Sequence, residues 1–250
     1  MPFPAVHPAL DRALLNKGYA EPTPVQAAVL EGEHADRDLL VSAQTGSGKT
    51  VAFGLAAAPT LLGDKPVFGL GGAPLCLAIA PTRELAMQVA AELQWLYADA
   101  GAKIATCVGG MDARREARAL GFGVHIVVGT PGRLKDHIDR GNLDLSALKV
   151  AVLDEADEML DMGFREDLEF ILDQAPAERR TLLFSATIAR EIATLAKRYQ
   201  KDAVRIDATD KTRQHADIEY RAYRIAPNEI EHAVVNTLRW FEAPRAMVFC

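Results

Sequence analysis

Cysteine is scarce in this sequence, and its spacing excludes two kinds of small stabilised domain. Only three cysteines occur among 250 residues, at Cys76, Cys107 and Cys250, and no two have the CxxC spacing. An odd, widely spaced set argues against a disulfide framework and against a zinc knuckle. We therefore expect a protein of a reducing compartment, and 250 residues are enough to bury a core without metal or disulfide help.

Targeting and membrane-spanning segments are also missing. The first residues, MPFPAVHPALDRAL, have no basic start followed by a long apolar stretch, so we expect no signal peptide. No run of about 18 apolar residues occurs, which argues against a transmembrane helix. These observations favour a cytoplasmic protein with no membrane partner.

Positive charge is in the minority, but it is unevenly distributed. The net charge is −6, which argues against a basic protein that coats nucleic acid. Residues 151–175 alone hold nine acidic residues and one arginine, so the remaining 225 residues carry a net charge of +2. One acidic segment sets the overall sign, and nucleic-acid binding elsewhere in the chain is not excluded.

Short apolar runs alternate with stretches of helical periodicity. Several runs are apolar throughout, as in parallel strands that are buried on both faces. This alternation predicts an α/β fold with a doubly wound parallel sheet, in which ligands bind beyond the carboxyl ends of the strands. Strands are expected at 38–43, 75–80, 103–108, 124–129, 149–153, 181–185 and 203–207, and helices at 83–100, 131–140, 165–174 and 190–200.

The end of the chain differs from the rest. Residues 1–207 form the expected first domain, and the polar, aperiodic residues 208–217 are typical of a linker. A strand (218–225), a helix (228–241) and an apolar strand (246–250) are expected after it. Because 218–250 are too few residues for a separate core, we interpret them as the start of a second, truncated α/β domain.

A glycine-rich loop follows the first expected strand and precedes a helical stretch. Its backbone N–H groups and the helix N-terminus suit phosphate oxygens. Lys49 would reach the β- and γ-phosphates of a nucleotide, and the Thr50 hydroxyl would bind Mg²⁺. The general phosphate-loop pattern has glycine where Ala43 stands, and the alternative is a glycine turn with a chance Lys-Thr pair. The loop comprises Ala43, Gln44, Thr45, Gly46, Ser47, Gly48, Lys49 and Thr50.

A second glycine-rich segment, residues 69–74, resembles a dinucleotide-binding fingerprint only superficially. Proline occupies the third glycine position, and no helix is expected after it. We interpret it as a flexible loop.

Carboxylates stand at the end of another apolar strand. Asp154 is placed to hold Mg²⁺ beside a triphosphate, and Glu155 is placed to polarise an attacking water as a general base. The alternative for Asp154–Asp157 is a solvated acidic loop. Most of the acidic residues that follow are expected on a solvated helix face.

Together these residues resemble the DEAD-box ATP-dependent RNA helicases, a resemblance that covers about residues 1–207. Several motifs occur in the order of that family. The resemblance implies a RecA-like domain that binds ATP and single-stranded RNA, and a second RecA-like domain in cis that supplies arginine fingers. The matching segments are Gly18–Gln26 (Q motif), Ala43–Thr50, Pro81–Leu85, Gly109–Gly110, Thr130–Arg133, Asp154–Asp157 and Ser185–Thr187.

Adenine recognition is the role implied for the Q motif, which contains Tyr19, Thr23 and Gln26. The Gln26 amide offers an acceptor and two donors, and so suits both N6 and N7 of adenine. The alternative is a glutamine on a helix surface. The resemblance also implies an upstream aromatic residue stacked on adenine. Phe3 is the candidate, unless it packs on the helix that follows.

RNA contact is implied for three loops that follow strands. Backbone N–H groups, hydroxyls and arginines there would hold RNA phosphates without reading bases, and contacts to 2′-hydroxyls would favour RNA over DNA. The alternatives are a surface helix start at Arg83 and a helix N-cap at Thr130. The resemblance also implies that the Ser185 and Thr187 hydroxyls bond to Asp157 and connect hydrolysis to RNA. The implied RNA contacts are Pro81, Thr82, Arg83, Gly110, Thr130, Pro131, Gly132 and Arg133.

The sequence therefore predicts an ATP-dependent RNA helicase that uses ATP and Mg²⁺, and it leaves the oligomeric state open. Arginine fingers contribute about 10³–10⁵ in rate, so we expect this 250-residue chain to bind ATP but to hydrolyse it slowly. A nucleotide-dependent RNA-binding module and a DNA translocase are the alternatives.

Overall fold

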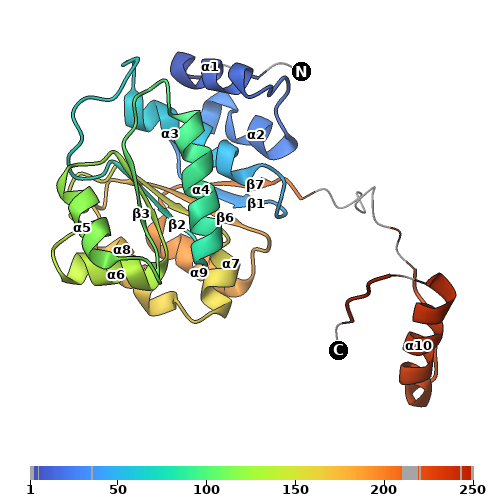
Figure 1. Ribbon diagram of the computed structural model, residues 1–250. Helices are drawn as coiled ribbons and strands as arrows, with labels where there is room; N and C mark the ends of the chain where they lie inside the picture. Colours follow the sequence, from blue (N-terminus) through green and yellow to red (C-terminus); the bar gives the residue numbers. More distant parts are fainter. Residues whose placement is uncertain are drawn as a thin grey trace. The chain divides into compact units, whose positions relative to one another are not determined.

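The computed structural model describes residues 3–4, 6–34, 36–209, 219, 221–242 and 244–248. The chain divides into two compact units, Met1–Thr209 and Asp210–Cys250, which are considered separately (Figure 1). No helix among the described residues is long and apolar enough to cross a membrane.

A seven-stranded sheet forms the centre of the first unit. Its strand order is β3-β4-β2-β5-β6-β1-β7, and all neighbouring strands are paired in parallel. The predicted α/β fold with a parallel sheet is therefore confirmed. The strands are β1 (Leu39–Ser42), β2 (Cys76–Ile79), β3 (Ile104–Cys107), β4 (Ile126–Gly129), β5 (Val150–Leu153), β6 (Arg180–Ser185) and β7 (Val204–Asp207).

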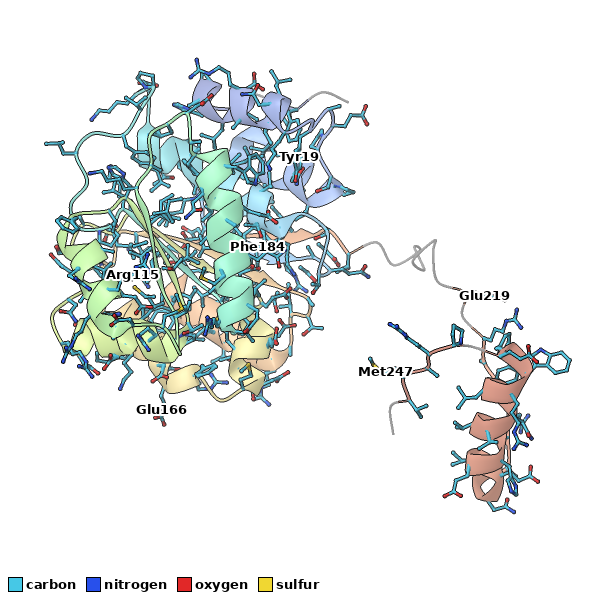
Figure 2. All side chains as sticks on the ribbon, in the orientation of Figure 1. Tyr19, Arg115, Glu166, Phe184, Glu219 and Met247 are labelled. Carbon is cyan, nitrogen blue, oxygen red and sulfur yellow. The ribbon has the colours of Figure 1, made fainter. Side chains whose placement is uncertain are left out.

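The apolar runs become strands because helices cover both faces of the sheet. In β5, Val150 and Val152 belong to one core, whereas Ala151 and Leu153 belong to a second core on the other face. Successive side chains of a strand point to opposite faces, so a strand buried on both faces has to be apolar throughout. Phe184 of β6, which is labelled in Figure 2, is fully buried. Its ring makes an edge-on contact with the ring of Phe53.

The helices divide between the two faces (Figure 1). Buried residues of α1, α2, α3 and α4 contribute to one core, and those of α5 to α9 contribute to the other. The helices of the first unit are α1 (Pro8–Asn16), α2 (Pro24–Val29), α3 (Lys49–Leu62), α4 (Arg83–Leu96), α5 (Ala113–Gly121), α6 (Pro131–Asp139), α7 (Ala156–Asp161), α8 (Arg165–Gln174) and α9 (Arg190–Tyr199).

Parallel pairing brings the carboxyl ends of the strands to one edge of the sheet. Backbone hydrogen bonds continue past the strand ends and fix the segments that follow. The N–H of Ala43 donates to the carbonyl oxygen of Ser185 at 3.0 Å, and the N–H of Asp154 donates to the carbonyl oxygen of Ile79 at 2.9 Å. The phosphate loop and the acidic segment therefore begin at the same edge of one sheet.

The loop at residues 69–74 lies near the opposite ends of the strands. Gly72 forms an isolated antiparallel bridge with Val124. Gly71 and Gly123 approach so closely that a Cβ on Gly123 would lie 2.4 Å from the Gly71 carbonyl oxygen. Gly123 also has a φ of +78°, which is costly for other residues. These glycines are required by backbone packing, and the segment forms no helix and no dinucleotide-binding turn.

The second unit contains a 3₁₀ turn (Pro227–Glu229) and helix α10 (Ile230–Phe241), close to the predicted helix at 228–241. The predicted strand at 218–225 is wrong for its described residues, and residues 246–248 form no strand either. A strand needs a hydrogen-bonded partner, and none is present among the described residues of this unit. Residues 210–217 of the predicted linker, Ile218, Tyr220, Phe249 and Cys250 lie outside the described residues.

Substituting Gly123 tests the close backbone approach. Gly123→Ala should lower the free energy of unfolding by about 2 kcal/mol or more, because it adds a left-handed φ penalty to a clash with backbone. Gly121→Ala is the matched control, since a Cβ there meets nothing within 4 Å. Chemical denaturation should separate the two variants, and equal stability would contradict this account of the loop.

His125 predicts a pH dependence of stability. Its Nδ1 accepts a hydrogen bond from the Lys103 N–H at 2.9 Å, its Nε2 lies 3.2 Å from the Gly69 carbonyl oxygen, and its ring stacks on Phe68. Burial lowers the pKa of His125 below 6.5, so in mild acid the unfolded state binds a proton that the folded state does not. Wild type should therefore lose stability relative to His125→Gln as the pH falls from about 7 to 5. If the free energies of unfolding of the two proteins changed equally with pH, the prediction would be wrong.

Candidate functional site

The glycine-rich loop joins the end of β1 to the start of α3, at the edge of the sheet where the parallel strands end. Gly46 and Gly48 have φ values of +79° and +89°, so left-handed backbone turns the chain into the helix. Gln44, Thr45 and Gly46 are exposed, whereas Lys49 and Thr50 are buried at the first turn of α3. The loop thus presents backbone to solvent above a helix N-terminus, as phosphate binding requires.

Lys49 is held by a carboxylate from the other side of the site. Its Nζ donates to Glu155 Oε1 at 2.8 Å and to the Ala43 carbonyl oxygen at 3.1 Å. The hydroxyl of Thr45 donates to the same Oε1 at 2.9 Å. Both charged side chains are more than nine-tenths buried, so the pair contributes attraction in a poorly solvated environment.

Glu155 reaches Lys49 through an unusual backbone conformation. Its φ and ψ are 51° and 52°, which lie in the left-handed region that most residues other than glycine avoid. This geometry costs about 1–2 kcal/mol. The buried ion pair with Lys49 is a compensating interaction at the same residue.

Asp154 carries a buried oxygen that lacks a partner. The residue is 2% exposed, and its Oδ1 has no hydrogen-bond partner among the described residues. Burial raises the pKa of Asp154 to about 7, with Glu155 adding to the rise and Lys49 opposing it. A buried acceptor that accepts nothing suits a bound cation. Asp154 and the Thr50 hydroxyl, at the first turn of α3, both offer the oxygen ligands that Mg²⁺ prefers.

Gln26 ties the start of α2 to the phosphate loop. Its Oε1 accepts from the Thr23 N–H at 3.0 Å, and its Nε2 donates to the Gly48 carbonyl oxygen at 3.2 Å. Gln26 is fully buried, and a Cβ on Gly48 would lie only 2.5 Å from Nε2. The side chain is therefore no surface glutamine. It retains one amide N–H and one lone pair of Oε1 for another partner.

The two aromatic candidates for adenine contact make packing contacts. Tyr19 stacks on Trp95 of α4, with ring centroids 5.5 Å apart. Phe3 is partly buried against the core that includes α1. Adenine contact by either ring stays a prediction.

Asp157 connects the acidic segment to the segment after β6. Its Oδ2 accepts from the Thr187 N–H at 2.9 Å and from the Thr187 hydroxyl at 3.0 Å. The Ser185 hydroxyl donates to the Thr187 carbonyl oxygen at 2.7 Å. Burial raises the pKa of Asp157, but interactions with the Ser185 and Thr187 side chains and with backbone N–H groups outweigh this and lower the pKa overall. The carboxylate is thus held in its charged form.

The predicted RNA-contacting loops follow β2, β3 and β4, which are neighbours in the sheet. The Thr82 hydroxyl caps α4 by accepting from the Leu85 N–H at 3.2 Å. Thr130 takes the N-cap position of α6 without a side-chain capping bond, and Pro131 follows at N1. Pro81 and Pro131 are buried and shape their loops, whereas Arg83, Gly110 and Gly132 are exposed and Arg133 is partly exposed.

Sequence reasoning missed a buried cluster behind these loops. Glu116 of α5 contacts Arg133 at 2.9 Å and His137 at 2.7 Å. Ligand atoms of Cys107, Glu116 and His137 lie within 4.8 Å of one another, which is close enough for a metal ion. However, Arg133 already supplies the positive charge that the carboxylate needs. No spacing signal in the sequence identifies this cluster, because its members come from three separate elements.

Comparisons with known proteins agree with this geometry. Residues 23–195 match the family described as DEAD/DEAH box helicase. A DEAD-box ATP-dependent RNA helicase CshA from Bacillus licheniformis is 43% identical over 205 residues, which cover 81% of this chain and 41% of that protein. The chain thus spans about two fifths of the length of the curated bacterial relatives that it matches.

Two solved structures are similar over most of the chain. A DEAD box protein from the hyperthermophile Methanococcus jannaschii is 38% identical with a TM-score of 0.74, covering 94% of this chain and 62% of that one. A hypothetical ATP-dependent RNA helicase from Sulfolobus tokodaii is 32% identical with a TM-score of 0.70, covering 80% and 56%. With its phosphate loop, its acidic strand end and its Asp157–Thr187 link on one sheet edge, this chain belongs to the DEAD/DEAH box helicase family.

Proposed function

We propose that residues 1–207 are the ATP- and RNA-binding domain of an ATP-dependent RNA helicase, which drives local RNA unwinding or remodelling of RNA–protein complexes in the full-length protein. The observation that carries this proposal is the convergence of Lys49 and Thr45 on Glu155, beside the buried Asp154. Residues 208–217 would then be the linker to a second RecA-like domain, of which 218–250 are the beginning.

Nucleotide binding would use the loop that Gln26 supports. Phosphate oxygens would accept from backbone N–H groups of residues 44–50 and from the Lys49 ammonium. The free capacity of the Gln26 amide would serve adenine. Because Gln26 is also hydrogen-bonded to Gly48, the side chain that would bind the base is in direct contact with the loop that would bind the phosphates.

The cation would be held by Asp154 and Thr50, directly or through water. When bound, Mg²⁺ would neutralise part of the phosphate charge. Asp154 needs such a partner, because its unpartnered Oδ1 is buried and its pKa is raised to about 7. The bound Mg²⁺ would add positive charge beside the Lys49 ammonium.

Hydrolysis would require a change of partner at Glu155. Its Oε1 now accepts from Lys49 and Thr45. If Lys49 turns to the phosphates, this oxygen becomes available to accept a proton from an attacking water. The same ion pair would therefore hold both side chains in place until a nucleotide separates them.

RNA would bind along the adjacent strand ends through its backbone. Exposed backbone at Gly110 and Gly132 and the arginine at position 83 suit phosphates and ribose, and these contacts carry no base sequence. Asp157 follows β5, as Glu155 does, and Thr187 follows β6, the neighbour of the strand that leads into the phosphate loop. The hydrogen bonds between Asp157 and Thr187 would therefore link this edge to the nucleotide.

A turnover assay of the full-length protein tests the proposal. ATP hydrolysis should be stimulated by single-stranded RNA and far less by DNA of the same sequence. Lys49→Ala should lower nucleotide affinity by about 100-fold, because it removes the ammonium that would donate to the phosphates. Lys197→Ala, on the exposed face of α9, is the matched control. Equal stimulation by DNA would indicate a translocase, and unchanged activity of Lys49→Ala would refute the phosphate-loop assignment.

Substituting Glu155 separates binding from chemistry. In the full-length protein, Glu155→Gln should keep ATP affinity within about threefold and slow hydrolysis by about 10²–10⁴, the usual contribution of a general base. An RNA-clamped state should accumulate and be visible as slow RNA release. Glu158→Gln, an exposed residue of the same acidic segment, should behave as wild type. Loss of ATP affinity in Glu155→Gln would mean that Glu155 is not the base.

A further inference from the structure

One buried carboxylate joins two of the loops that we propose to contact RNA, although it belongs to neither. Glu116 is on α5 and is 7% exposed. Its Oε1 accepts from the backbone N–H of Val108 at 3.0 Å, just before the Gly109–Gly110 turn. Its Oε2 accepts from Arg133, at the start of α6, at 2.9 Å. Glu116 therefore spans the ends of β3 and β4.

Arg133 is held at a second point on the same loop. Its guanidinium donates to the Met111 carbonyl oxygen at 3.2 Å as well as to Glu116. From the other direction, the Arg83 guanidinium contacts Met111 Sδ at 3.3 Å. A Cβ on Gly110 would lie 3.0 Å from Arg83 Nη1. Two arginines from neighbouring strand ends thus meet on the loop that Glu116 anchors.

His137 supports Glu116 from inside the protein. It is fully buried, and its Nε2 lies 2.7 Å from Oε2 of Glu116, which accepts the hydrogen bond. Asn142 donates to its Nδ1 at 3.4 Å. Glu116 is therefore surrounded by donors: among the described residues, Arg133 is its cationic partner and the His137 imidazole is a further hydrogen-bond donor. A buried carboxylate with fixed donors has little freedom to move.

We propose that Glu116 is a positioning residue for RNA binding, which fixes the Arg133 guanidinium and the Gly110 turn relative to each other. This inference rests on the proposed function, in which both loops contact RNA. A guanidinium that is already fixed loses less side-chain entropy on binding phosphate, so RNA affinity depends on a residue that RNA does not touch.

The positioning role requires more than the negative charge of Glu116, because each of its two carboxylate oxygens accepts from a different N–H group. In Glu116→Gln, the amide nitrogen would face either the Val108 N–H or the Arg133 guanidinium, whichever way the side chain is turned. Glutamine therefore keeps the size of the side chain but loses one of the two attachments. A purely electrostatic role would have the opposite consequence, since removal of a negative charge behind the loops would strengthen RNA binding.

The test is a double-mutant cycle on the 250-residue chain. Affinity for a fluorescein-labelled single-stranded RNA is measured by anisotropy, and affinity for a fluorescent ATP analogue is measured in parallel. Glu116→Ala and Arg133→Ala should each weaken RNA binding by about tenfold, as expected for hydrogen bonds to charged groups. The loss in the double variant should be smaller than the sum of the two single losses, because both single changes remove the contact between Glu116 and Arg133. Affinity for the ATP analogue should stay within about twofold, a margin inside the usual error of such comparisons.

Two further variants separate positioning from stability. Asp38→Asn removes another buried carboxylate, one that accepts from the backbone of Thr181 and Lys201, and it should lower stability without changing RNA affinity. Glu116→Gln should also weaken RNA binding and serves if Glu116→Ala does not fold. Wild-type or tighter RNA binding by Glu116→Gln, or additive losses in the cycle, would overturn the inference. Absence of RNA binding by wild type would instead overturn the proposed function, and this inference with it.

Discussion

The contact between Lys49 and Glu155 is the interaction around which the site is arranged. It joins the start of α3 to the end of β5, although β6 lies between β5 and β1 in the sheet. A buried charge without its partner costs about 3–5 kcal/mol, so the two segments cannot separate cheaply. This contact also fixes Thr45, whose hydroxyl donates to Glu155, and Asp154, which precedes Glu155 in the sequence. Parallel strands bring the ends to one edge, and the ion pair fixes the distance between them.

Gln26 and Asp157 extend this arrangement in opposite directions. Gln26 binds the loop at Gly48 and fixes the start of α2, and Asp157 binds Thr187 at the end of β6. Each side chain uses polar atoms that could also serve a ligand or a moving segment. The site is therefore built from residues with both structural and chemical roles, and substitutions there would change stability and activity together.

Much of the fold could be predicted from the sequence, because seven apolar runs admit few alternatives to a parallel sheet. Strands were expected within one or two residues of their ends. No residue range was predicted for the short helices α1, α2, α5 and α7, since proline, charge or brevity hides their periodicity. Positions of the ATP motifs followed from strand ends. The Glu116 cluster could not be foreseen, because in a stretch reading ARREARA the glutamate looks like a solvated helix residue. Strands in the second unit were wrongly predicted, since apolar sequence alone supplies no pairing partner.

The left-handed conformation of Glu155 places local conformational preference and chemistry in opposition at one residue. Glycine or asparagine would adopt this φ with less strain, and so would favour the folded backbone. Neither could supply the carboxylate that meets Lys49. At this position, therefore, a search for stabilising substitutions and a search for the proposed activity would diverge, and a consensus based on backbone preference would remove the carboxylate that the proposed hydrolysis needs.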